Sequence, residues 1–142
     1  MSIADEASLL GTWKLVSWVS EDVETQERRA LFGNHPTGYI IFMESRRVVA
    51  ILTASGRKSP KNDADKAESF GSMVAYSGRF HLDGNQLTTR VDIAWDEGQV
   101  GTEQIRFCAI AGETLTIETA PFVSPRFGGR TIRAFLTWCR ES

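Results

Sequence analysis

The chain has 142 residues, of which 42% are hydrophobic and 24% are charged, and its formal net charge is −2 at pH 7. This length suits one domain over residues 1–142 that buries a core without disulfides or a metal. The slight negative charge disfavours a nucleic-acid-binding protein, which normally presents a basic face. No apolar run approaches the roughly 20 residues that span a bilayer, and residues 1–6 lack a secretory signal pattern, so we expect a cytoplasmic protein.

Period-two alternation between turn residues dominates the chain and predicts a series of half-buried strands. The first strand begins at residues 11–13 and carries bulky residues on both faces, Trp13 and Trp18. An apolar run over 37–43 predicts the next strand. Residues 62–76 break the alternation, and their apolar residues recur at helical spacing. We expect one short amphipathic helix there, which could cover the mouth of a barrel.

Residues 83–86, Asp-Gly-Asn-Gln, predict a hairpin, because Gly and Asn tolerate the positive φ of a two-residue turn. Pairing outward from this turn places Phe80 opposite Thr89. One face of the hairpin is then apolar as far as Trp95, and the other face is polar. Asp92 falls on the polar face beside Arg79 and Arg90, where we expect a surface ion pair.

A second hairpin is predicted around residues 111–113. Its more apolar face consists of Arg106, Cys108, Ile110, Leu115 and Ile117. If that face points inward, Arg106 points inward with it and could hold an acidic ligand through paired hydrogen bonds. The alternative is that Arg106 emerges at the rim or pairs with Glu103 or Glu118, because an unpaired buried charge is costly.

Counting these segments gives eight to ten strands, one helix and no βαβ unit. The pattern predicts an all-β protein, an antiparallel up-and-down barrel that removes its sheet edges by closing. A small closed barrel either fills its interior with side chains or holds one small ligand.

Five segments in this order resemble the bacterial lipocalin-like domain family, which is related in shape to the lipocalins and the fatty-acid-binding proteins. They are Leu10–Ser17, His35–Ile40, Ala75–Phe80, Val100–Arg106 and Leu136–Arg140. The resemblance implies a barrel with an internal cavity for a small, largely apolar molecule. It predicts the fold more specifically than it predicts an activity. Members often have a His pair where this chain has Thr89 and Arg90, so no histidine role carries over.

The resemblance also implies a contact between the first and last strands. In lipocalins a Trp of the first strand packs under an Arg of the last strand at the closed end of the barrel. Trp13 and Arg140 occupy these places here, and a cation–π contact between them would stabilise the fold by about 1 kcal/mol.

We expect any ligand site to surround Arg106. The candidate ligand-binding residues are Arg106, Tyr39, Tyr76, Trp95, Gln104 and Phe80, with Thr102 beside them. The tyrosine hydroxyls and the amide would make polar contacts, and the two other aromatic residues would line the apolar wall. For each aromatic residue, ordinary core or rim packing is the alternative.

The sequence predicts no metal and no cofactor. His35 and His81 have no second ligand at a useful spacing. Cys108 and Cys139 lie in apolar strands without a metal-binding or redox spacing, and we expect two buried free thiols.

Three functions are compatible with these features. The first is a binding protein for a small apolar or aromatic molecule, with or without an acidic group. The second is a small-barrel enzyme, a cyclase, isomerase or hydrolase of an apolar metabolite, which would need an ionisable pair with shifted pKa values in its pocket. The third is a homodimer whose contact uses Trp18, predicted on the opposite face of its strand from Trp13.

Overall fold

Strands account for most of the chain. The computed structural model describes residues 2–3 and 5–141. The strands are β1 (Ser2–Ile3), β2 (Gly11–Asp22), β3 (Arg28–Arg29), β4 (Thr37–Phe42), β5 (Arg47–Thr53), β6 (Met73–Asp83), β7 (Gln86–Ala94), β8 (Glu103–Ala111), β9 (Thr114–Thr119), β10 (Phe122–Ser124) and β11 (Arg130–Arg140). The helices are α1 (Glu6–Leu9) and α2 (Asp63–Gly71), with single 3₁₀ turns η1 (Glu97–Gln99) and η2 (Pro125–Phe127). Neither α-helix of the described residues has the length and apolar character needed to cross a membrane.

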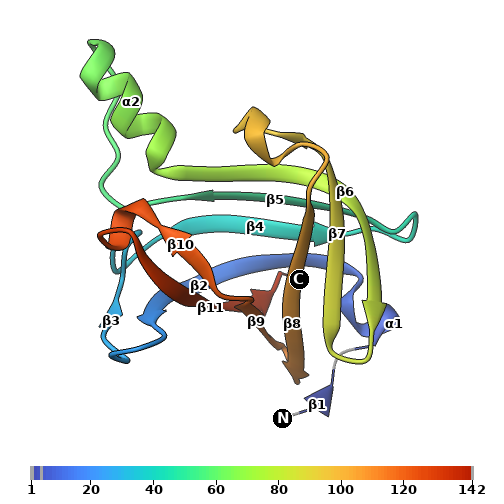
Figure 1. Ribbon diagram of the computed structural model, residues 1–142. Helices are drawn as coiled ribbons and strands as arrows, with labels where there is room; N and C mark the ends of the chain where they lie inside the picture. The colour runs from blue at the N-terminus through green and yellow to red at the C-terminus, as the bar shows by residue number, and fades with distance from the viewer. Residues whose placement is uncertain (1, 4, 142) are drawn as a thin grey trace.

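Eight of the strands form a closed antiparallel barrel (Figure 1). They pair in the order β2, β4, β5, β6, β7, β8, β9 and β11, and β11 pairs back onto β2. The short strands β1, β3 and β10 extend this sheet by pairing with β8, β2 and β11. The predicted all-β up-and-down barrel is therefore confirmed.

The two ends of the barrel differ. Tight turns join β4 to β5, β6 to β7 and β8 to β9 at one end, where α1 also lies. The connections at the other end are longer and contain β3, α2, η1, and β10 with η2. We call this second end the mouth, because access to the interior is easier between long loops than through tight turns.

Trp13 and Arg140 seal the end opposite the mouth, as the resemblance implies. The guanidinium carbon of Arg140 lies 4.1 Å from the centroid of the Trp13 ring, which has no exposed surface. Nη1 and Nη2 of Arg140 donate to the carbonyls of Leu10 and Ser8 at 2.9 and 2.6 Å. The indole Nε1 of Trp13 donates to the carbonyl of Leu9 at 2.9 Å. The first strand, the last strand and α1 are thereby joined.

An irregularity in β2 changes which residues face the interior. Leu15 pairs with Trp138 and Ser17 pairs with Thr137, so Val16 is an extra residue without a partner on β11. Its side chain is 52% exposed. Because a bulge shifts the alternation by one residue, Trp13 and Trp18 both face inward. The expectation that Trp18 lies on the opposite face from Trp13 was therefore wrong.

A second irregularity lies in β7. The expected pairing of Phe80 with Thr89 is confirmed, but Gly78 pairs with Val91 and Ser77 with Ile93, which leaves Asp92 as the extra residue. A Cβ added at Gly78 would lie only 2.0 Å from the carbonyl oxygen of Arg90. Only glycine therefore allows the backbones of β6 and β7 to approach this closely.

Asp92 forms a surface ion pair as expected, but its partner is Arg47 and not Arg79 or Arg90. Its carboxylate binds Nη1 and Nη2 of Arg47 at 3.0 and 2.8 Å on the outside of the barrel.

The predicted short helix is α2, but it does not cover the mouth. None of its described residues is buried, and Figure 1 shows it projecting away from the barrel. Its last turn is held by three donors from three different segments. Arg57, Trp95 and Arg126 donate to the carbonyls of Ser69, Phe70 and Gly71 at 3.1, 3.1 and 2.6 Å. This turn therefore ties three connections of the mouth together.

Replacement of Arg140 by alanine tests the seal at the closed end. We expect Arg140→Ala to lower the free energy of unfolding by about 2–3 kcal/mol, because it removes a cation–π contact and two charged hydrogen bonds. Urea unfolding followed by tryptophan fluorescence measures the change. Arg133→Ala, on the outside of the same strand, is the matched control and should change stability by less than about 0.5 kcal/mol. Equal effects of the two substitutions would contradict the assigned role of Arg140.

Candidate ligand-binding cavity

A cavity of about 490 Å³ lies inside the barrel and extends to the mouth. This volume is within the usual range of small-molecule sites, roughly 300–1,000 Å³. Most of the lining is apolar and comes from every barrel strand except β7, with polar residues concentrated on β8 and on the connection before it. Residues that line it include Trp18, Ile40, Leu52, Val74, Tyr76, Gln99, Thr102, Glu103, Gln104, Arg106, Ile117, Phe122, Ala134, Leu136 and Trp138.

Arg106 is part of the cavity wall. It stands on β8 between Leu87 of β7 and Thr119 of β9. Its Nη1 donates to the carbonyl of Ile105 at 3.1 Å, and among the described residues no carboxylate lies within 4.0 Å of the guanidinium. The carboxylate of Glu103, the alternative partner, instead lies 3.9 Å from Arg90. Arg106 therefore keeps most of its hydrogen-bond donors available, and its partial exposure limits the cost of the charge.

Tyr76 and Cys108 lie close to Arg106 and carry protons at neutral pH. Burial raises the pKa of the Tyr76 hydroxyl, while the charge of Arg106 lowers it to a smaller extent. Burial raises the pKa of the Cys108 thiol to about 12, again with a smaller opposing effect of Arg106. Tyr76 lines the cavity, so its hydroxyl can donate a hydrogen bond to a bound molecule.

Gln104 and Thr102 also line the cavity, closer to the mouth than Arg106. The Oε1 atom of Gln104 is buried and has no hydrogen-bond donor among the described residues. The hydroxyl of Thr102 donates to the carbonyl of Gln99 at 2.6 Å, which fixes the connection between β7 and β8. The structure thus brings Arg106, Tyr76 and Gln104 together, with Thr102 beside them.

Three residues expected at the site lie elsewhere. Tyr39 is 37% exposed on the outside of β4, because Gly38 and Ile40 take the inward positions. The apolar run over 37–43 has no alternation from which this orientation could be read.

The other two corrections concern Trp95 and Phe80. The Asp92 bulge reverses the alternation of β7, so Trp95 leaves the inner face and packs on Phe70 of α2 with ring centroids 5.7 Å apart. Phe80 points inward but belongs to the packed core, where its ring meets that of Phe42 edge-on at 5.3 Å. Neither of them lines the cavity.

Two tryptophans that were not expected at the site line the cavity, Trp18 and Trp138. Trp138 is only 1% exposed, and Trp18 packs on Phe32 with ring centroids 4.2 Å apart. The alternation of the last strand places Trp138 on the same face as Leu136, and this pattern could have predicted that Trp138 faces the interior. For Trp18 the bulge at Val16 hides the signal.

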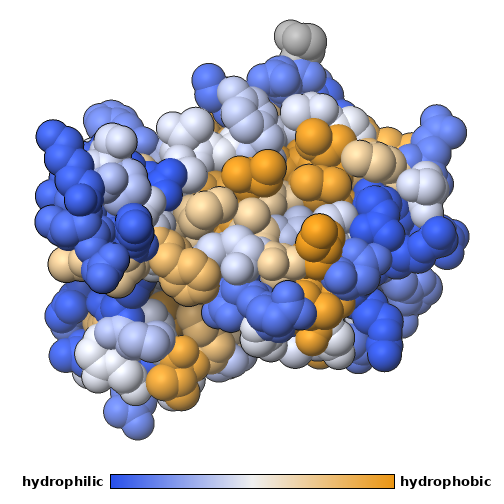
Figure 2. Space-filling model, turned by 90° about the horizontal axis from the view of Figure 1, so that it is seen from above, coloured by the Kyte–Doolittle hydropathy of each residue, from blue (hydrophilic) through white to orange (hydrophobic). Residues whose placement is uncertain are grey.

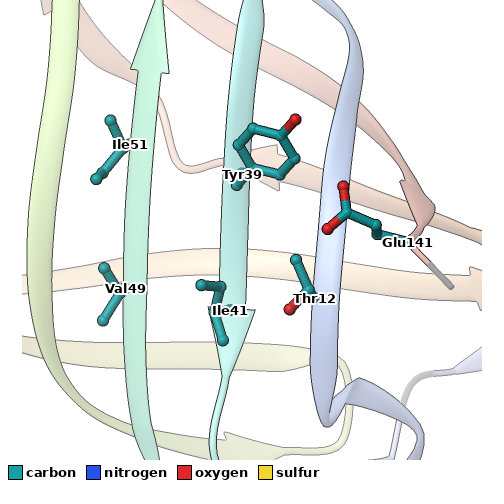
Figure 3. A pocket seen from close by; sticks show the side chains of 6 residues that line it. All are labelled: Thr12, Tyr39, Ile41, Val49, Ile51 and Glu141. Atoms are coloured by element: carbon teal, nitrogen blue, oxygen red, sulfur yellow. The ribbon is translucent and has the colours of Figure 1, made fainter.

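A second, shallower pocket of about 440 Å³ lies on the outside of the barrel. Figure 3 shows its lining side chains, which are Thr12, Tyr39, Ile41, Val49, Ile51 and Glu141. Figure 2 shows apolar side chains gathered in the middle of one face, between hydrophilic ends.

Because Trp18 faces inward, it does not supply the surface for the homodimer we expected. A homodimer remains a prediction without an assigned contact.

The cysteines differ from each other. Cys108 is buried as expected, but Cys139 is exposed, so the expectation of two buried thiols was wrong for Cys139. Among residues 2–3 and 5–141 the structure contains no group of three or more His, Cys, Asp or Glu side chains that could hold a metal ion.

The chain is a small closed up-and-down β-barrel protein with an internal, partly polar cavity. Within that class, the family described as a lipocalin-like domain matches residues 10–141. The chain belongs to the lipocalin-like domain family. Comparison with curated proteins gives no match.

Thiol labelling tests the raised pKa of Cys108. Since the Cys108 thiol stays protonated well above pH 8, we expect it to resist iodoacetamide in the folded protein, while Cys139 reacts. In the Cys139→Ser variant, mass spectrometry should detect no labelling at pH 8 until urea unfolds the chain. Rapid labelling of the folded Cys139→Ser variant at this pH would show that the thiol is neither buried nor protonated as described.

Proposed function

We propose that the protein binds one small, largely apolar molecule with an acidic group inside the barrel. The observation that carries this proposal is Arg106, a guanidinium in the wall of an otherwise mainly apolar cavity with no carboxylate partner among the described residues. Arginine binds carboxylates through two parallel hydrogen bonds. An apolar acid would satisfy both the charge and the surrounding apolar surface.

Tyr76 supports the same ligand class. A tyrosine whose pKa is raised by burial keeps its proton and is a hydrogen-bond donor at neutral pH. The hydroxyl lies near enough to Arg106 for that charge to influence its pKa. A carboxylate bound to Arg106 could therefore accept a further hydrogen bond from Tyr76.

Gln104 completes the polar contacts toward the mouth. Its side chain adds a polar amide to the cavity wall there. Membership of the lipocalin-like family supports a ligand-binding barrel, and the ligand class comes from these side chains.

Catalysis receives no support from the two protonated groups beside Arg106. An acid or base catalyst works best when its pKa lies near the operating pH. Burial moves the pKa of Tyr76 and of Cys108 upward, away from neutrality. We therefore propose binding rather than turnover.

Replacement of Arg106 by leucine tests the proposed anchor. We expect Arg106→Leu to weaken binding of decanoic acid about 10- to 100-fold, because charged hydrogen bonds contribute about 1.5–3 kcal/mol. Binding of decan-1-ol should change little. Isothermal titration calorimetry measures both affinities.

Arg79→Leu is the control for this test, because Arg79 is exposed on the outer face of β6. It should leave the affinity for the acid unchanged. Equal weakening of acid and alcohol in Arg106→Leu would refute the role of the guanidinium. Failure of both probes to bind the unchanged protein would refute the proposed function.

A further inference from the structure

The pairing between β8 and β9 stops before it reaches the mouth. The last pair in that direction is Arg106 with Thr119, and beyond it a single hydrogen bond of 3.4 Å runs from the Ala120 amide to the Ile105 carbonyl. Pro121 follows, and proline has no N–H to donate. The chain then continues as β10, which pairs with β11 and lies apart from β8 in Figure 1. Among the described residues, the first part of β8 therefore has a paired neighbour, β7, on one side only.

The lining of the cavity reaches this unpaired edge of β8. Along a strand that is paired on both sides, side chains alternate between the two faces, and Val74 and Tyr76 of β6 line the cavity in this way. At the edge of β8, by contrast, the consecutive residues 103–106 all line the cavity, and so do the consecutive residues 119–122 opposite them. Inward and outward side chains can border one cavity only where it passes between the strands. We call this opening between β8 and β10 the side gap.

Arg106 stands at the inner end of the side gap. Its Nη1 donates to the carbonyl of Ile105, which is the same oxygen that accepts the last hydrogen bond between the two strands, from Ala120. The guanidinium is therefore held at the point where the strands separate. A carboxylate bound to it would have the barrel interior on one side and the side gap on the other.

The cavity wall differs in polarity in these two directions. Toward the closed end the wall is apolar and includes Ile117, Leu136 and Trp138. At the side gap one edge is apolar and consists of residues 120–122. The other edge is polar and consists of Gln99, Thr102, Glu103 and Gln104. An apolar chain is stabilised by burial in the interior, whereas a polar group attached near the carboxylate can keep its hydrogen bonds at the polar edge or in solvent.

We propose that the ligand lies with its apolar tail toward Trp138 and its acidic head at the side gap, and that it carries a polar substituent on the carbon next to the carboxyl group. The substituent projects into the side gap along its polar edge. The ligand class is therefore a 2-substituted apolar acid, such as the N-acyl derivative of an amino acid with a long apolar side chain. This inference rests on the proposed function, which supplies the acid, and it adds the orientation and the place of the substituent.

The test uses two probes that carry the same bulky polar group at opposite ends. In one, a nitroxide ring is attached through an amide at carbon 2 of decanoic acid, and in the other the same group is attached at carbon 10. We expect the tighter-binding enantiomer of the carbon-2 probe to bind at least as tightly as decanoic acid. The carbon-10 probe should bind about tenfold or more weakly than decanoic acid, because bulk forced into a packed interior is destabilising. Isothermal titration calorimetry gives the affinities.

Ala120→Trp narrows the side gap from its apolar edge. We expect this variant to weaken binding of the carbon-2 probe by about tenfold or more and binding of decanoic acid by less than about threefold, because the substituent alone occupies the gap. Val123→Trp is the matched control. Val123 is 64% exposed on β10 and is not part of the cavity lining, so this variant should bind both molecules as the unchanged protein does.

A second readout needs no variant and covers the case in which Ala120→Trp fails to fold. In protein labelled with nitrogen-15, the nitroxide of the bound carbon-2 probe should broaden the amide signals of residues 103–105 and 122–123. The amide signals of the tight turns at residues 84–85 and 112, at the closed end, should stay sharp. Ascorbate added to the solution should reduce the bound nitroxide, because the side gap leaves it in contact with water.

The outcomes separate this inference from the proposed function. If decanoic acid binds and both enantiomers of the carbon-2 probe bind more weakly, the head position is refuted while the acid-binding function stands. Broadening at the closed-end turns, or equal effects of Ala120→Trp on the carbon-2 probe and on decanoic acid, also refutes it. If none of the acids binds the unchanged protein, the proposed function fails and this inference fails with it.

Discussion

The pairing of β11 with β2 is the constraint on which the rest of the structure depends. It turns an open meander into a closed barrel, so that inward side chains from eight strands share one interior. Trp13 and Arg140 reinforce this pairing and join it to α1 at the end with tight turns. With that end sealed, the accessible part of the interior lies toward the long connections at the mouth, and the cavity is found there.

The polar groups of the cavity are arranged unevenly around it. Arg106, Tyr76 and Gln104 come from β8 and β6, whereas the indoles of Trp18 and Trp138 come from β2 and β11. Packed side chains could have filled the whole interior, and near the closed end they do. A charged group in an apolar wall is costly unless it has a partner. The guanidinium of Arg106, which lines the cavity with no carboxylate partner among the described residues, is the reason we assign the cavity to a ligand.

The barrel and its hairpins could be predicted from the sequence, because each depends on local alternation or on strand order, and the resemblance to the lipocalin-like family implied the Trp13–Arg140 contact. The cavity wall could be predicted only where the alternation continues without interruption, as at Arg106 on β8. At Val16 and Asp92 an extra residue reverses the alternation, so Trp18 turns inward and Trp95 turns away. A bulge depends on pairing with the neighbouring strand, and that information is absent from the pattern of a single strand.

A crystal structure of the complex with decanoic acid tests the central claim most directly, because two pockets of similar size compete for the molecule. We predict the carboxylate within hydrogen-bond distance of the Arg106 guanidinium and the alkyl chain along the apolar lining toward Trp138. Electron density for the acid in the outer pocket beside Tyr39 and Ile51, with none in the barrel, would contradict the account.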